Sequence, residues 1–302
     1  MTSSPGPWPQ ARCAVPRVWC AISTSWRRGE KNFYGVIYFL EKIIVQIIMI
    51  FVDQVHPELH ARHTPGATIE ELTPGGYRLT IPGGLAGTYR WAQLDDYAQI
   101  QRRQFRWKTP CSLEIKARVS IKNLPGTWGF GFWNDPFSAS QGLGGMARRL
   151  PVLPNTAWYF YGSPPNYLSL RDDIPAQGFL AAVFSSPPIP PPLLTPGLLA
   201  LPLLALRPTA RLIRRLARSI VRNEAVAVKT DFTQWQTYRI DLTPQVTHFT
   251  INGNLVSEIA CVPRGPLALV LWIDNQFAAF TPDGRLKSGT LPNPPAWIEI
   301  QF

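Results

Sequence analysis

The sequence predicts an all-β protein, a two-sheet antiparallel sandwich with one helical insertion. About twelve short segments between residues 66 and 302 have the apolar alternation or apolar concentration of strands, and only one connection between them has a helical period. The 31 prolines and 22 glycines supply the many turns that a short-stranded fold needs. A hydrophobic content of 45% with 11 tryptophans excludes a mainly disordered chain and suffices for one large core or two smaller ones.

The strands are predicted from their alternation and from the turns between them. Segments 68–72 and 77–81 flank Thr73-Pro74-Gly75-Gly76, which is typical of a hairpin turn. Segment 112–122 alternates apolar with mostly charged residues, so one face is expected to be buried. Asn252-Gly253 predicts a second tight hairpin. The remaining predicted strands are 127–133, 156–162, 166–170, 178–185, 235–242, 246–251, 255–259, 267–274 and 296–302.

Residues 1–63 are expected to form an N-terminal extension of the sandwich, which is predicted to span residues 64–302. Within the extension, the mostly apolar run 33–52 is long enough for a membrane span or an uncleaved signal anchor. Glu41 and Lys42 in the middle of the run oppose this interpretation, because each charge costs about 2.5–3.5 kcal/mol at a bilayer centre.

The start of the chain therefore has three open interpretations. The run 33–52 is a membrane span, or it is a buried helix, or translation starts near Met49 and residues 1–48 are not part of the protein. The compartment follows from the choice: we expect membrane association if 33–52 anchors the chain and a cytoplasmic protein if translation starts near Met49.

The helical insertion is predicted over residues 186–224. It begins with a proline-rich stretch, continues with leucines, and ends in a predicted helix over 208–222. On a helical wheel one face holds arginines and the other holds aliphatic residues. The arginines are Arg211, Arg215, Arg218 and Arg222, and the aliphatic residues are Leu212, Ile213, Leu216 and Ile220.

Two interpretations of this amphipathic helix stay open. It is a lid that packs its apolar face on the sandwich and leaves its arginines in solvent, or segment 193–222 contacts a membrane surface or a partner. Residues 191–223 hold six arginines and no acidic residue, so much of the net charge of +11 is local. No nucleic-acid motif accompanies this charge, and no nucleic-acid partner is predicted.

Cysteine and histidine do not indicate a metal or cofactor site. We expect Cys111 and Cys261 to be buried thiols, because so few cysteines do not make a disulfide scaffold. His56, His60 and His63 would share one face of a helix, a geometry compatible with a metal, but the neighbouring prolines favour a solvated connector. No metal and no cofactor are predicted.

Several aromatic motifs resemble a known family. Gly126-Thr127-Trp128 followed by Gly131-Phe132-Trp133, then Trp235-Gln236-Thr237-Tyr238, then Phe249-Thr250-Ile251-Asn252-Gly253 occur in an order similar to that of the concanavalin A-like lectins and glucanases. Within that group the chain looks closest to the laminarinase-type (family 16) glycoside hydrolases. The resemblance covers about residues 66–302 without the 186–224 insertion, and it implies a jelly-roll sandwich and a sugar-related function.

The catalytic motif of that family is missing. The family carries Glu-x-Asp-x-x-Glu on the strand after its Trp-rich strand, which aims the carboxylates into one cleft. The corresponding segment here is 156–162, Thr-Ala-Trp-Tyr-Phe-Tyr-Gly, and no two acidic residues anywhere in the chain are spaced i, i+2. Asp135 and Asp274 are the weak catalytic candidates that remain, so enzymatic activity stays open while a non-catalytic role is favoured.

The aromatic residues predict a carbohydrate-binding face. In 127–133 the side of the strand that holds Gly129, Gly131 and Trp133 leaves room for a sugar ring or for a neighbouring aromatic side chain. The leading hypothesis is a non-catalytic, lectin-like protein. The alternatives are a diverged glycoside hydrolase acting on a β-glucan-type polysaccharide and a structural protein that associates through 193–222. The predicted carbohydrate-binding residues are Trp133, Asn134, Asp135, Trp158, Tyr159, Tyr161, Tyr167, Trp272 and Asn275.

Overall fold

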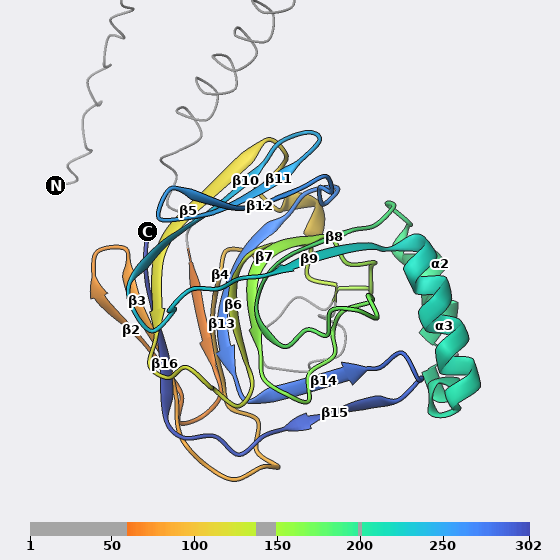
Figure 1. Cartoon of the computed structure of the whole chain (residues 1–302), viewed down its shortest axis with the longest axis horizontal. Coiled ribbons are helices and arrows are strands. Elements are labelled where there is room, and N and C mark those ends of the chain that lie inside the picture. Colours follow the sequence, from red (N-terminus) through yellow and green to blue (C-terminus); the bar gives the residue numbers. More distant parts are fainter. Residues whose placement is uncertain (1–58, 137–148, 199–200) are drawn as a thin grey trace, which may run out of the picture. The chain divides into compact units, whose positions relative to one another are not determined.

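The predicted strands assemble into two seven-stranded antiparallel sheets, which confirms the two-sheet sandwich (Figure 1). The computed structural model describes residues 59–136, 149–198 and 201–302. The first sheet contains, in spatial order, β1 (His60–His63), β4 (Trp91–Asp95), β13 (Ala268–Asp274), β6 (Thr127–Trp133), β7 (Thr156–Gly162), β8 (Gly178–Ser185) and β9 (Arg222–Ala227).

The second sheet has the order β12 (Asn254–Ile259), β11 (Thr247–Ile251), β10 (Gln236–Leu242), β5 (Cys111–Val119), β16 (Ala296–Gln301), β3 (Gly76–Ile81) and β2 (Thr68–Thr73). A separate hairpin joins β14 (Gln276–Phe280) to β15 (Leu286–Thr290). Asn252, with a positive φ of 52°, and Gly253 form the predicted tight turn between β11 and β12.

The space between the two large sheets is filled by aromatic and aliphatic side chains. Trp128, Phe130 and Phe132 point inward from β6, as their alternation requires, and all three are buried. Trp128 stacks on Phe179 with ring centroids 4.8 Å apart, and Phe130 packs edge-on against Tyr238 at 5.1 Å. Cys111 and Cys261 are both free and buried, which confirms the prediction of two thiols.

The structure adds strands that the sequence pattern did not predict. They are β1, β4, β9, β14 and β15. The sandwich therefore begins before residue 64, because residues 60–63 pair with β4, and the insertion ends before residue 222, where β9 begins. The predicted strand over 166–170 was wrong, since only Tyr167 makes an isolated bridge, to Ala279.

The histidine and N-terminal predictions have different outcomes. His60 and His63 lie on strand β1, where a separation of three residues places them on opposite faces, so they do not share the face that a helix would give. His56, the run 33–52 and Met49 lie outside the described residues. Within the ranges that the structure describes, no helix is both long and apolar enough to cross a membrane.

The insertion contains three short helical segments, α2 (Pro191–Leu198), η2 (Leu201–Ala205) and α3 (Arg207–Ile220), which lie beside the sandwich in Figure 1. The predicted lid with its apolar face on the sandwich was wrong. Arg214 is 3% exposed and points into the protein, whereas Leu212 and Leu216 are 52% and 54% exposed. A helical wheel shows that two faces differ in polarity, but it does not say which face meets the protein.

Hydrogen bonds to backbone carbonyl groups explain why α3 packs on the sandwich through Arg214 and not through its leucines. Arg214 Nη1 donates to the carbonyl oxygens of Ser169 at 3.0 Å and Phe280 at 2.7 Å. Its Nη2 donates to the carbonyl oxygen of Arg171 and to Asp172 Oδ1, both at 3.0 Å. Backbone oxygens that are removed from water need donors, and a guanidinium supplies five. The loops beneath α3 therefore select the side that holds Arg214 and Ala210, while Arg211, Arg215 and Arg218 of the predicted arginine face stay exposed.

Candidate functional site: a groove on the outer face of the first sheet

A groove with an aromatic floor lies on the outer face of the first sheet, the face turned away from the second sheet. Strand pairing sets the floor in rows, since Trp272 is directly opposite both Gln93 and Gly129, and Gly129 is opposite Phe160. The cavity measures about 310 Å³, at the small end of the range for ligand sites. Its lining residues include Tyr89, Trp91, Gln93, Thr127, Trp133, Trp158, Phe160, Asn166, Val270, Trp272, Asp274 and Gln276.

Two glycines of β6 give the tryptophan rings their places. A Cβ atom on Gly129 would lie 2.7 Å from Trp272 Cη2, and one on Gly131 would lie 2.7 Å from Trp158 Cβ. Both distances are shorter than a normal carbon–carbon contact, so only glycine at positions 129 and 131 leaves room for the side chains of Trp272 and Trp158 on the sheet. Trp158 and Trp272 pack together with ring centroids 5.3 Å apart. Neighbouring tryptophans thus fill the space above the glycines, and they form the floor of the groove.

Asp274 is the carboxylate of the groove, and a chain of hydrogen bonds fixes it. Trp272 Nε1 donates to Thr127 Oγ1 at 2.9 Å, and Thr127 Oγ1 donates to Asp274 Oδ1 at 2.8 Å. The backbone N–H groups of Thr127 and Gln276 donate to the same oxygen at 3.2 and 3.0 Å. Burial nevertheless raises the pKa of Asp274 to about 7, because desolvation outweighs these donors.

A second carboxylate lies on the same face of the sheet, but far from the first. Asp95 on β4 is directly opposite Val270, and Asp274 is opposite Trp91, four residues along the strand. At about 3.3 Å per residue the two carboxylates are separated by roughly 13 Å. A retaining glycosidase needs about 5–5.5 Å, and an inverting one about 6.5–9.5 Å.

Asp95 is also already engaged by other side chains. Arg62 Nε donates to Asp95 Oδ2 at 2.8 Å, and Gln93 Nε2 donates to the same oxygen at 2.9 Å. The backbone N–H of Tyr97 donates to the other carboxylate oxygen, Oδ1, at 3.2 Å. These contacts make Asp95 a structural anion that holds β1 to β4.

The structure places some of the predicted binding residues in the groove. Trp133, Trp158 and Trp272 all line it. The prediction was wrong for Tyr159 and Tyr161, which point between the sheets and belong to the buried core. The cause is the two-residue period of a strand: in β7 the side chains of 158 and 160 face outward, so those of 159 and 161 face inward.

Asn134 and Asp135 are committed to local structure. Asn134 Oδ1 accepts from the backbone N–H of Asn155 at 3.0 Å, and its Nδ2 donates to the carbonyl oxygen of Leu153 at 2.8 Å. Asp135 is 1% exposed, has a positive φ of 50°, and accepts from Arg149 Nη1 at 2.6 Å. Neither lines the described groove, so Asp135 serves as the anion of a buried ion pair.

Tyr167 and Asn275 also bond to their own surroundings. The Tyr167 hydroxyl lies 3.2 Å from the carbonyl oxygen of Arg171, and the Arg214 guanidinium lies 5.3 Å from the Tyr167 ring centroid. Asn275 is fully buried, accepts from the backbone N–H of Arg90, and donates to the carbonyl oxygens of Thr88 and Leu291. These two predictions therefore named residues that stabilise loops at the edge of the groove.

Sequence reasoning missed the wall formed by β4 and the preceding turn. Tyr89 and Trp91 stack with an interplanar angle of 17°, and Gln93 follows on the same face. A signal was present, because Trp91, Gln93 and Asp95 alternate with the apolar Ala92 and Leu94. The strand was not predicted because Gln93 and Asp95 are polar, yet every residue of β4 is buried.

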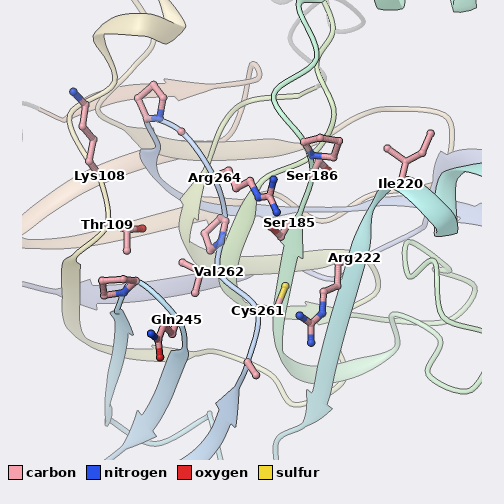
Figure 2. Close-up of a pocket in the computed structure, with 16 residues that line it drawn as sticks. Lys108, Thr109, Ser185, Ser186, Ile220, Arg222, Gln245, Cys261, Val262 and Arg264 are labelled. Carbon is pink, nitrogen blue, oxygen red and sulfur yellow. The ribbon is translucent and has the colours of Figure 1, made fainter.

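A second cavity, of about 770 Å³, lies elsewhere on the sandwich and has a basic lining. Figure 2 shows Arg222 and Arg264 extending toward it from different segments, with Ser185 and Cys261 between them. Lys108 also lines it, and no carboxylate does among the described residues. Burial raises the pKa of the Cys261 thiol, which argues against a reactive thiolate there.

Comparison with known proteins bears on the fold. No protein-family model matches the sequence, and no curated protein matches it either. Among solved structures, a Bacillus licheniformis β-glucanase is similar over 83% of this chain and 92% of its own, with 10% identity and a TM-score of 0.42.

Two further solved structures illustrate this likeness. A family 16 endo-glucanase from Bacteroides ovatus is 8% identical over 83% of this chain and 97% of its own, with a TM-score of 0.41. A glycoside hydrolase family protein from Mycobacterium thermorestibile is 14% identical over 75% of this chain and 76% of its own, with a TM-score of 0.37. These values concern the fold alone and assign no role to any residue.

Proposed function

We propose that the groove on the outer face of the first sheet binds a carbohydrate and does not cleave it. The observation that carries this proposal is a floor of tryptophan rings beside a few fixed polar groups, with one carboxylate among the described lining residues. Sugar rings have C–H faces that pack on aromatic rings and hydroxyl edges that need hydrogen-bond partners. A mostly apolar site with a few placed polar groups suits both requirements.

Three of the polar side chains that line the groove are each already hydrogen-bonded to the protein. Gln93, Asn166 and Asp274 are lining residues from three different segments. The Nε1 of Trp133 is buried and has no acceptor among the described residues, so a ligand hydroxyl can bond to it only if the ring shifts. The expected ligand is thus a neutral saccharide that stacks on Trp158 and bonds through its edge.

The arrangement of carboxylates opposes hydrolysis. The separation of roughly 13 Å between Asp95 and Asp274 gives this pair the spacing of neither glycosidase mechanism. Residues 137–148, which lie outside the described part, contain no Asp or Glu in the sequence and cannot supply a partner.

A diverged hydrolase is the second candidate, and one observation favours it. Burial raises the pKa of Asp274 to about 7, which suits a carboxylic acid that donates a proton near neutrality. Release of reducing ends from a β-glucan by the wild type, lost in Asp274→Asn, would favour this candidate over a binding protein.

Binding is tested with the full chain and a set of neutral oligosaccharides, β-glucan fragments among them, by calorimetry. We expect Trp158→Ala to weaken binding about tenfold or more, because it removes a stacking surface. The matched control is Trp235→Ala, since Trp235 is 43% exposed and packs under Arg118 of the second sheet. Circular dichroism verifies that each variant is folded. The proposal fails if no saccharide binds at millimolar concentration, or if both variants bind as the wild type does.

A further inference from the structure

The docking of α3 through Arg214 leaves an apolar stripe facing solvent. Leu212, Leu216 and Ile220 are spaced four residues apart and are 52%, 54% and 45% exposed, so they form a single outward stripe. Leu203 in η2 and Leu206 before α3 are 48% and 57% exposed and extend the apolar surface toward the start of the helix. An exposed apolar surface of this kind indicates a site of contact with a membrane or with another molecule.

The segment that carries the outward stripe is positively charged, and neighbouring carboxylates neutralise part of this charge: Asp172 pairs with Arg214 and Arg218, and Glu224 pairs with Arg222. Residues 174–223 contain six arginines and no Asp or Glu. Arg215 is exposed and forms no salt bridge with a carboxylate of the described chain. At the start of α3, Arg207 lines a cavity together with Lys287 and with Arg285, which pairs with Asp283.

The remaining arginines of the helix serve to hold it. Arg214 and Arg218 both bind Asp172, and Arg211 Nε donates to the carbonyl oxygen of Asp283 at 2.9 Å. The protein therefore uses three of its cations to fix the orientation of α3. Arg215, beside the stripe, is left for an external partner.

We propose that the outward stripe docks on the surface of an anionic lipid bilayer, with α3 lying in the plane of the interface. An exposed helix with aliphatic residues on its outer face and arginines beside them is the form that interfacial membrane helices take. A second copy of the chain is disfavoured as the occupant, because two such faces would bring like charges together. The proposal does not rest on the carbohydrate groove, whose described lining includes no residue of α3.

The charge of the lipid is part of the inference. Anionic headgroups would neutralise Arg215, Arg207 and Lys287, each of which adds attraction that salt screens. The leucines would enter the boundary between headgroups and acyl chains, which accounts for their exposure. Binding should therefore need both an anionic surface and an apolar stripe.

Co-sedimentation of the full chain with vesicles tests the proposal. The probes are vesicles of phosphatidylcholine alone and of phosphatidylcholine with phosphatidylglycerol at three parts to one. We expect partitioning into the anionic vesicles to exceed that into the neutral ones by about tenfold, and to fall as salt is added.

Variants identify the surface that binds. Leu212→Gln combined with Leu216→Gln should reduce binding to anionic vesicles by about tenfold or more, and Arg215→Gln should reduce it less and weaken its salt dependence. Leu255→Gln is the matched control, because Leu255 is 58% exposed on β12 in the second sheet. The changed leucines are exposed, so unfolding temperatures should stay close to that of the wild type.

Three results would overturn the proposal. The wild type shows no preference for anionic vesicles, or the double variant binds them as the wild type does, which would assign lipid binding to another segment such as 33–52. The third is a dimer in light scattering that the double variant abolishes without any vesicle binding, which would make a second copy the occupant.

Discussion

Thr127 and Asp274 are joined by two hydrogen bonds across neighbouring strands of the first sheet. The Thr127 hydroxyl donates to Asp274 Oδ1 at 2.8 Å, and its backbone N–H donates to the same oxygen at 3.2 Å. The same hydroxyl accepts from Trp272 Nε1 at 2.9 Å. One threonine thus fixes both the carboxylate and a tryptophan ring of the groove.

The pKa of Asp274 predicts a pH dependence of stability. Burial raises it from the ordinary value to about 7, so the folded state binds this proton more tightly than the unfolded state does. Stability from this group is therefore greatest below about pH 4, falls as pH rises toward 7, and is constant above that, a loss of about 4 kcal/mol in all.

Asp274→Asn should remove this dependence. The amide keeps an oxygen acceptor for Thr127 but carries no charge, so the variant should unfold at a higher temperature than the wild type at about pH 8 and at a similar one at about pH 4. Thermal unfolding across this pH range measures the difference. If the difference in unfolding temperature between the two proteins is the same at every pH, the raised pKa of Asp274 is contradicted.

Thr127→Val tests the link between the carboxylate and the tryptophan. Valine has the same shape but leaves Trp272 Nε1 without its acceptor and takes one donor from Asp274, so we expect a loss of about 1–3 kcal/mol in the free energy of unfolding. The pKa of Asp274 should rise further, and NMR titration of its carboxyl carbon would detect the change. Thr68→Val, at an exposed position of β2, is the control and should be nearly neutral.

Gly129→Ala should disturb the groove by contact. The added Cβ would lie 2.5 Å from the carbonyl oxygen of Tyr159 and 2.7 Å from Trp272 Cη2, so the ring must move. Overpacking of this kind costs about 1–3 kcal/mol, and tryptophan fluorescence should change with it. Gly178→Ala separates contact from backbone strain, because its Cβ would meet nothing within 4 Å while its φ is +79°. Equal fluorescence changes in both variants would argue against the ring displacement.

The sequence predicted those strands whose pattern is local. Segment 112–122 alternates so clearly that β5 (Cys111–Val119) follows from it, and 127–133 coincides with β6. Strand β4 was missed because its polar residues Gln93 and Asp95 are buried only through contacts with Arg62 and Tyr97, which are fixed by the tertiary fold. Local alternation cannot show such partners.

The groove could be predicted only in part, because local alternation does not show which face of a strand points outward. The aromatic content of β7 indicated a binding face, but a choice between two registers decided whether Trp158 or Tyr159 points outward. Pairing with Gly131 and Ala182 settles that choice, and it depends on strands distant in sequence. The orientation of α3 depends likewise on carbonyl groups of Ser169 and Phe280.

Arg214→Met tests what orients the insertion. The change removes the Arg214 donors to the carbonyl oxygens of Ser169, Arg171 and Phe280, so we expect the docking of α3 to weaken by about 2–4 kcal/mol. Limited proteolysis should then cut faster within 201–221, while unfolding of the two large sheets changes little. Arg215→Met, on the exposed side of the same helix, is the control.

The same variant connects orientation to lipid binding. If arginines hold the helix so that its leucines face outward, loss of Arg214 should lower the affinity for anionic vesicles although the outward stripe is unchanged. In Arg214→Met, protection from protease and vesicle binding should both fall. In Arg215→Met, protection from protease should stay as in the wild type. If Arg214→Met loses its protection from protease but keeps full affinity for anionic vesicles, then lipid binding does not require that α3 is docked on the sandwich.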